Sequence, residues 1–321
     1  MAVPTATVAV SASGSLVEPP AAPGRRWRRR QRRTPGEWVL DIFIVVVLAV
    51  LAIATLYPFL FELTISLSTP ADAQQSGLHI LPTDPSTASW HAVLASSGIL
   101  RAYLNTIART VAATVLTVVL TAMMAYPLAQ RSFPHRRLIN FLLLFSMLFS
   151  GGFIPLFLLV KNLGLLDSRW SLVLPGAVAA MNVILMRNFF QAIPGELIDA
   201  ARADGASEMR VLFRIILPLS KPVLAVVGLW TALANWNAWF DALLYINDPN
   251  KQVLQMFIRD TVLTQADPIL GGTNPAMLGA APTSQTLGAA AVMIATLPII
   301  ALYPFLQKYF ARGILLGSVK G

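Results

Sequence analysis

Side chains that could bind a sugar gather in one apolar segment, residues 222–245. Indole rings offer flat apolar faces for stacking, while amides and carboxylates can hydrogen-bond to hydroxyl groups. The same residue types also form aromatic belts at membrane surfaces and hydrogen bonds between membrane helices, so both interpretations stay open. The cluster contains Trp230 and Phe240, and its candidate pathway residues are Asn235, Trp236, Asn237, Trp239 and Asp241.

Few other residues suggest chemistry. The chain has no cysteine, which excludes disulfides, thiol catalysis and thiolate-bound metal. His79, His91 and His135 lack the spacing of metal ligands. No GxxxxGK[ST] phosphate-binding loop is present, so we expect no ATP hydrolysis, no enzyme activity and no cofactor in this chain.

Isolated polar residues interrupt other apolar segments. Asn105 and Arg109 are four apart and share a helix face. An arginine inside a membrane span is a functional candidate, but Arg109 is close enough to a predicted span end to reach the headgroups, so we weigh both. For Asn182 and Asn188 we favour packing contacts between helices.

A charged, helix-prone island occupies residues 192–222 between long apolar segments. Pro194 suits a first helical turn, where Glu196 and Asp199 favour the positive helix end. Gly205 can adopt the left-handed conformation that stops a helix, and Ala206 to Ile216 predict a second short helix closed by Pro218. The pattern predicts an elbow of two short helices.

This island resembles the EAA loop of binding-protein-dependent ABC importer permeases. The family pattern is Glu-Ala-Ala, a glycine four residues later, and then Ile-x-Leu-Pro. Here the first position is aspartate, which keeps the charge but shortens its reach. The matching residues are Asp199, Ala200, Ala201, Gly205, Ile215, Leu217 and Pro218, with Glu196 just before them.

The resemblance implies that this loop docks in a groove of a cytoplasmic ATPase. It further implies the type I importer permease (MetI-like) fold, a dimer of ABC ATPases that bind ATP, a second permease subunit and an extracellular solute-binding protein. The C-terminal residues LYPFLQKYFARGILLGSVKG resemble those of oligosaccharide and polysaccharide permeases, so the similarity covers residues 38–321. We expect a heterodimeric permease pair, although a homodimer stays open, and the sugar is not identified.

Composition predicts an all-α protein of the cell membrane, in contact with lipid. Hydrophobic residues make up 56% of the chain, charged residues 12%, and the mean hydropathy is +0.65. Hydropathy predicts six membrane helices, with boundaries uncertain by several residues. They cover residues 39–60, 103–128, 138–160, 171–189, 222–245 and 286–306.

Charge asymmetry predicts that both termini are cytoplasmic. The connections 129–137 and 307–321 contain basic residues and no acidic ones, as expected inside the cell. The longer connections 66–101 and 246–285 each contain one more acidic than basic residue. The island at 192–221 then lies inside, where an ATPase could reach it.

The chain begins with a predicted disordered basic tail, residues 1–37, ahead of the permease domain 38–321. Its arginine-rich run, residues 25–33, could be a nucleic-acid patch, a twin-arginine export signal or a cytoplasmic anchor. We favour the anchor and expect no nucleic-acid partner, because the following apolar run is long enough to span a membrane.

We also make predictions for the third span and for the external segment that follows the fifth. Gly151, Gly152 and Pro155 interrupt the third span, where we favour close helix packing at glycine over a kink beside a pathway. The external segment 246–285 is rich in Pro, Gly, Thr and Asn, and we expect a loop that contacts a binding protein or caps the outer mouth.

The preferred hypothesis is a permease subunit of an ATP-driven carbohydrate importer. A secondary transporter driven by an ion gradient is the alternative, although we find no second copy of a repeat. A membrane-anchored nucleic-acid-binding protein would leave five further spans without purpose.

Overall fold

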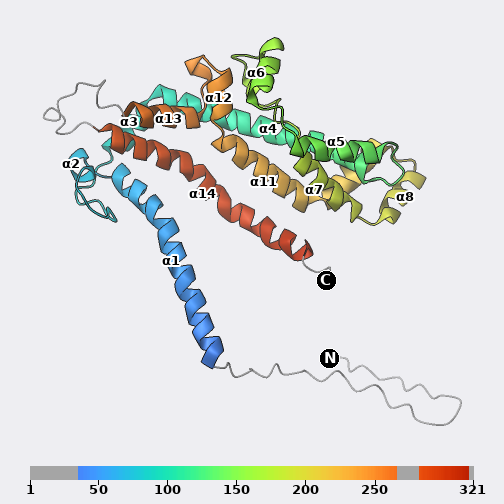
Figure 1. Cartoon of the computed structure of the whole chain (residues 1–321), viewed down its shortest axis with the longest axis horizontal. Coiled ribbons are helices and arrows are strands. Elements are labelled where there is room, and N and C mark those ends of the chain that lie inside the picture. Colours follow the sequence, from blue (N-terminus) through green and yellow to red (C-terminus); the bar gives the residue numbers. More distant parts are fainter. Residues whose placement is uncertain (1–34, 266–281, 318–321) are drawn as a thin grey trace, which may run out of the picture. The chain divides into compact units, whose positions relative to one another are not determined.

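A computed structural model of the protein describes residues 35–265 and 282–317. Helices dominate these residues, which confirms the predicted fold class at the level of secondary structure (Figure 1). The predicted tail of residues 1–37 lies outside the described residues except for its last three, which begin helix α1.

The chain separates into two compact units, Met1–Thr55 and Leu56–Gly321. Helix α1 (Pro35–Ser66) begins in the first and ends in the second. Its residues are apolar all round rather than on one face, as expected for a helix in a membrane. The Thr55 hydroxyl donates to the Leu51 carbonyl at 2.8 Å, so this polar group is satisfied within the helix.

Helix α4 (Ser97–Ala129) is the axis of the second unit. It packs against α11 (Lys221–Asn237) and α7 (Ala180–Gln191), and Figure 1 shows the three side by side. Alanine and other small residues of α4 let these helices approach closely. The buried core that joins them includes Ala122, Ala125, Val183, Met186, Val223 and Val227.

A second core forms around α14 (Ser284–Gly317), which packs against α13 (Leu254–Gln265), α3 (Ala88–Ala95) and α11. Short helices α2 (Pro70–Ala73) and η3 (Pro249–Lys251) lie in the connections. Buried residues of this core include Val93, Ile99, Trp236, Leu254, Ile258, Ala290 and Ile294.

The expectation of a loop throughout residues 246–285 is therefore wrong for its first half. Leu254 and Ile258 are four apart and bury one face of α13 against α14. The glycine and proline content that suggested a loop lies mostly after residue 267, and residues 266–281 are outside the described part of the chain.

The predicted span 138–160 consists of two helices, α5 (Arg136–Leu148) and α6 (Phe153–Asn162), which meet at 112°. Gly152 has a φ of +80°, and a Cβ built on it would meet no atom within 4 Å. The expectation of close helix packing at these glycines is wrong, because Gly152 supplies a left-handed turn instead.

The predicted span 171–189 is helical only in its second half. A 3₁₀ turn, η1 (Arg169–Leu172), is followed by irregular backbone up to α7. Pro175 and Gly176 interrupt the helix there, a turn signal that the apolar residues around it obscured. The span predicted at 222–245 is also broken, because α11 ends at Asn237 and α12 (Phe240–Tyr245) follows an extended Ala238.

The described residues contain three helices long and apolar enough to cross a membrane, or up to five if each bent pair forms one span. The multi-span character of the chain is thus confirmed. Six spans with both termini in the cytoplasm stay a proposal.

The α4–α11 contact gives a testable prediction at Gly228, where an added Cβ would lie 3.7 Å from Thr114 and Val118. These are ordinary contacts, so we expect Gly228→Ala to keep the fold and to gain up to about 1 kcal/mol in helix propensity. Gly228→Leu should overpack the contact and cost about 1–3 kcal/mol. Thermal unfolding of the purified variants measures both; a leucine variant as stable as the alanine variant would contradict this packing.

Candidate functional site

The structure contains the predicted pair of short helices at residues 195–219, and we call this segment the elbow. Its first helix, α8 (Gly195–Ala203), ends in a Schellman motif. The Ala206 N–H donates to the Ala201 carbonyl at 2.9 Å, and the Gly205 N–H donates to the Arg202 carbonyl at 3.0 Å. Gly205 has a φ of +77°, so the predicted left-handed glycine is confirmed.

The second helix differs from its predicted bounds of 206–216. It starts at Glu208 with α9 (Glu208–Val211), continues through a π turn, η2 (Leu212–Ile216), and ends with α10 (Leu217–Leu219). Pro218 therefore lies inside the helix, and the expectation that it closes the helix is wrong. The wide turn before it, where the Leu217 N–H donates to the Leu212 carbonyl, leaves room for the proline ring. The chain bends by 84° after the elbow, at Ser220.

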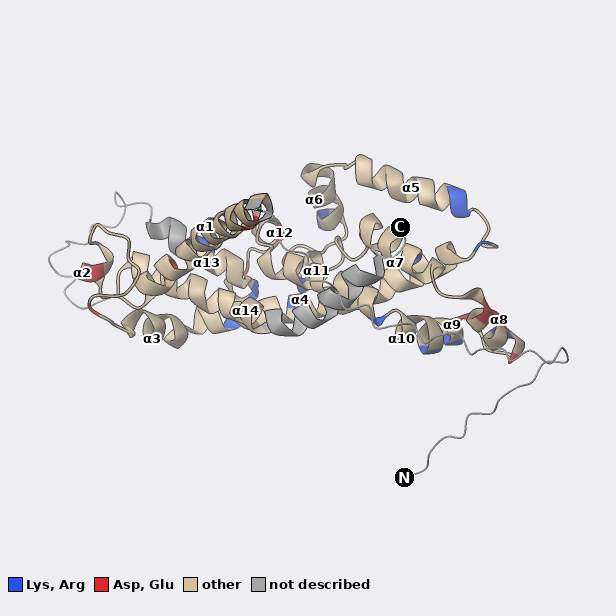
Figure 2. Cartoon of the chain, turned by 90° about the horizontal axis from the view of Figure 1, so that it is seen from below, with Lys and Arg blue, Asp and Glu red and all other residues tan. Residues whose placement is uncertain are grey.

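The elbow has a buried face and an exposed face. Ile198, Val211, Leu212 and Ile216 are buried in the core shared with α4 and α7, and Ala201 packs against the same core. Glu196, Asp199, Ala200, Gly205 and Pro218 are exposed, whereas Ile215 and Leu217 are half-buried. Acidic and basic residues occur along α8 to α10, as the colours of Figure 2 show. Most of the residues predicted to dock on a partner are thus accessible.

A polar cluster ties the elbow to α4. Arg202 donates to both carboxylate oxygens of Glu208, at 2.8 and 3.1 Å, and also contacts Asp199 at 3.5 Å. The buried Tyr126 of α4 donates its hydroxyl hydrogen to Glu208 at 2.5 Å. Charge-assisted hydrogen bonds of this kind are shorter and stronger than neutral ones. The two elbow helices are therefore joined to each other and to α4 through one carboxylate.

A cavity of about 510 Å³ lies between α4, α7 and α11. Its wall includes the irregular backbone before α7 and the break after α11, where freed peptide groups can face a hollow rather than lipid. The lining combines aromatic, amide, hydroxyl and charged side chains. The polar and aromatic members are Arg109, Thr117, Ser171, Asn182, Trp230, Thr231, Asn235, Asp241 and Tyr245.

Only some of the predicted pathway residues line this cavity. Asn235 and Asp241 line the cavity. Trp236 is instead buried against α14, where its Nε1 donates to the Ala295 carbonyl at 3.3 Å. Asn237 is exposed and donates to its own helix, and Trp239 lies 5.2 Å beneath the Arg259 guanidinium. The aromatic cluster thus serves packing and surface contacts as well as the cavity.

Arg109 points into the protein, which excludes the alternative that its side chain reaches the headgroups. Its side chain is 5% exposed and forms an ion pair with Asp241, whose side chain is 30% exposed. It also donates to Asn235 Oδ1 and to the Ala238 carbonyl, each at 3.3 Å. The carbonyl freed by the helix break is thereby satisfied by a charged donor.

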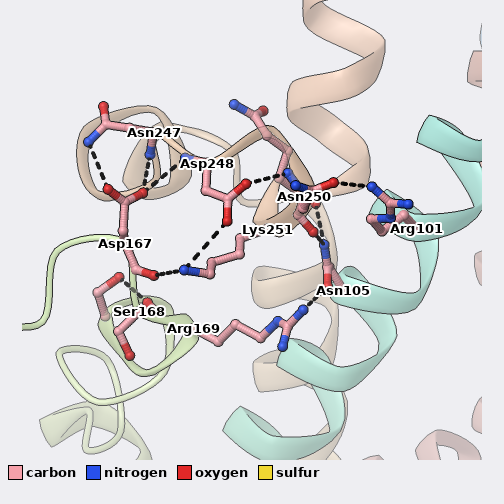
Figure 3. A network of polar contacts seen from close by, with 11 residues as sticks. Arg101, Asn105, Asp167, Ser168, Arg169, Asn247, Asp248, Asn250 and Lys251 are labelled. Atoms are coloured by element: carbon pink, nitrogen blue, oxygen red, sulfur yellow. Dashed lines mark hydrogen bonds and ion pairs between the residues drawn. The ribbon is translucent and has the colours of Figure 1, made fainter.

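A second polar network connects the loops around Asp167 and Asn247 with α4 (Figure 3). The Asp167 carboxylate accepts from the Asn247 and Asp248 N–H groups, at 2.6 and 3.0 Å, and Lys251 donates to the Asp167 carbonyl at 2.7 Å. Hydrogen bonds from the Asn247 and then the Asp248 N–H groups hold the pKa of the Asp167 carboxyl below its usual range. The charged carboxylate thus joins two connections far apart in sequence.

The same network reaches α4 through Asn105. This side chain donates to the Asn250 and Gln252 carbonyls, at 2.9 and 3.0 Å, and accepts from Arg169 at 3.1 Å. The shared helix face expected for Asn105 and Arg109 is confirmed, because both line a neighbouring cavity of about 220 Å³. Within the described residues, no three His, Asp or Glu side chains come together as a metal site.

Residues 115–316 match the family described as the inner membrane component of binding-protein-dependent transport systems. The chain belongs to this family. The match covers the elbow and more than half of the chain, so the family predicted from residues 199–218 is confirmed.

Similar proteins agree with this assignment. Protein LplC of Bacillus subtilis is 45% identical over 284 residues, covering 88% of this chain and 95% of that protein. The polygalacturonan/rhamnogalacturonan transport system permease protein YtcP of the same organism is 38% identical over 283 residues, covering 88% and 99%.

A solved structure shares the fold. One chain of a bacterial ABC transporter involved in the import of the acidic polysaccharide alginate matches with a TM-score of 0.80 at 32% identity, covering 87% of this chain and 99% of that chain. The importer permease fold is thus shown for most of the protein.

The network around Asp167 gives a prediction with a matched pair of variants. Asp167 has a φ of +57°, a conformation that asparagine tolerates better than alanine. Asp167→Ala removes the acceptor for two N–H groups, so amide hydrogens in a peptide spanning residues 247–251 should exchange about tenfold faster. Asp167→Asn should show a smaller increase. Equal exchange rates in the alanine variant and the unaltered protein would contradict a bridging role for this carboxylate.

Proposed function

We propose that the chain is a permease subunit of an ATP-driven carbohydrate importer in the cell membrane, with six spans and cytoplasmic termini. Family membership supports transport and favours an ATP-driven system over an ion-gradient-driven one. Relatives named for polygalacturonan and alginate support a carbohydrate substrate. The cavity supports it as well, because it combines indole, amide and hydroxyl groups suited to sugar rings.

One observation carries the coupling mechanism: α4 touches both the elbow and the cavity. Tyr126 binds Glu208 near one end, while Thr117 and Arg109 line the cavity farther along the same helix. The helical rise places Arg109 about 26 Å from Tyr126. A force applied to the elbow is therefore transmitted by a rigid helix packed on two neighbours rather than by a loop.

The proposal includes three kinds of partner. Cytoplasmic ABC ATPases dock on the exposed face that holds Asp199 and Ala200, and their closure moves the elbow. An extracellular solute-binding protein delivers the sugar, as the family description implies. A second, different permease subunit completes the membrane pathway, and the chain itself binds no ATP.

Single-cysteine labelling tests the placement of the elbow, because the natural chain has no cysteine. The Asp199 side chain is 76% exposed, so Asp199→Cys should react with a membrane-impermeant maleimide only in inside-out vesicles from which the ATPase has been stripped. Ser76→Cys, at an exposed position of the connection after α2, is the matched outer control and should react in intact cells. The same Asp199→Cys variant should crosslink to a co-purifying ATPase. Labelling of Asp199→Cys from outside, or no ATPase crosslink, would overturn the proposal.

Gly205 tests the coupling itself. At a φ of +77°, a β-branched residue is strained by about 1–2 kcal/mol, so Gly205→Val should distort the turn that closes α8. We expect the variant to remain in the membrane but to lose sugar uptake and sugar-stimulated ATPase activity. Gly205→Asn, which tolerates this conformation, should keep a substantial part of both. Normal uptake by the valine variant would show that the elbow geometry is not required.

A further inference from the structure

The cavity holds one ion pair, and its two members differ in how firmly they are held. The Arg109 guanidinium is bonded to Asn235 and to the Ala238 carbonyl in addition to Asp241. The Asp241 carboxylate accepts from Arg109 and from the N–H of its neighbour Ala242, at 2.9 Å. Arg109 is thus fixed by the surrounding helices, whereas Asp241 lies at the start of the short α12.

Burial adds to this difference. The Arg109 side chain is 5% exposed and that of Asp241 is 30% exposed. A buried guanidinium requires an anion, because leaving a charge unpaired in a poorly solvated site is costly. A partly exposed carboxylate regains hydration when it moves away. Asp241 is therefore the exchangeable member of the pair.

The rest of the cavity is built for an incoming ligand. The half-buried Asn182 lines the cavity from α7, and its amide can hydrogen-bond to sugar hydroxyls. Trp230 is 43% exposed and lines the same cavity, where it offers a face for stacking. A saccharide can hydrogen-bond to the amide and stack a ring on the indole.

Further positive charge lies next to the cavity. Arg109 also lines the smaller cavity of about 220 Å³, together with Arg169 and Lys251. Lys251 is paired with Asp248 at 3.6 Å, but Arg169 donates to Asn105 and forms no ion pair among the residues whose side chains the structure describes. Asp167 and Asp248 lie beside Lys251, so Arg169 is the positive charge near Arg109 that no described ion pair neutralises.

From these contacts we propose that the cavity selects saccharides that carry a carboxylate, such as uronic acid oligomers, and that Arg109 is the specificity-determining residue. The ligand carboxylate replaces Asp241 on the guanidinium fork, which binds carboxylates through two parallel hydrogen bonds. A neutral sugar provides no anion and leaves the Arg109–Asp241 pair closed. This inference rests on the proposed function, since it specifies the sugar class bound at the same cavity.

The test uses the permease purified with its co-purifying subunits. The probes are pentagalacturonate and its methyl ester, which share ring stereochemistry and length but differ in charge; maltopentaose is a second neutral probe. We expect the acid to bind about tenfold more tightly than the ester, as a charge-assisted contact implies. Equal affinities for acid and ester would overturn the inference while leaving a carbohydrate permease intact. Absence of binding by all three probes would contradict the proposed carbohydrate function as well.

Three variants separate recognition of the carboxylate from an effect on the structure. Asp241→Asn removes the competing carboxylate, so binding of the acid should tighten about tenfold, with binding of the ester unchanged. Asp84→Asn, the same substitution at an exposed position elsewhere, should change neither. The double variant Arg109→Gln/Asp241→Asn avoids an unpaired charge and should bind acid and ester equally. A preference for the acid that persists in the double variant would assign the selectivity to other residues.

Discussion

Broken helices in an apolar protein must find partners for the peptide groups that each break exposes. Lipid offers no hydrogen bonds, so irregular backbone has to lie against protein or a hydrated hollow. The carbonyl of Ala238 is satisfied by Arg109, and the irregular stretch with Pro175 and Gly176 lines the same cavity. The cavity and the breaks are consequently one feature: the breaks shape the hollow, and the hollow together with Arg109 makes the breaks tolerable.

Because its neighbours are broken around the cavity, α4 is the helix that connects the cavity with the elbow. It is uninterrupted over Ser97–Ala129 while its neighbours α7 and α11 are short or broken. Polar contacts are concentrated near its two ends, at Asn105 and Arg109 on one side and at Tyr126 on the other. Between them lie small residues in close contact with α11. Such a helix can carry displacement along its length, whereas the broken segments can change shape around the cavity.

Local sequence signals predicted the elbow well, because its geometry is set by neighbouring residues. Gly205 and the helices on either side of it follow from short-range rules for helix ends. The π turn was missed because nothing in composition marks it, and with it the true position of Pro218. Pro175 and Gly176 did carry a turn signal, but hydropathy averaged over twenty residues hid it. The same averaging hid α13, although Leu254 and Ile258, four residues apart, indicate a buried helix face.

Pairings between distant residues could not be predicted from one sequence. Nothing local connects Arg109 with Asp241, or Asp167 with Lys251, and Trp236 and Asp241 have similar surroundings in the chain despite facing different sides. The side of a helix on which a residue falls depends on where the helix ends. Because α11 ends at Asn237, residues after it follow a different geometry from those before it.

The π turn at Leu212–Ile216 has a consequence for how this segment could have arisen and changed. A turn of this kind accommodates one extra residue within an otherwise regular helix, and each residue corresponds to a rotation of about 100°. In a helix without such a turn, one inserted residue would rotate the charged side of α9 by more than a quarter turn relative to α10. The π turn therefore keeps the charged side of α9 and the residues of α10 on the same sides of the helix despite the extra residue.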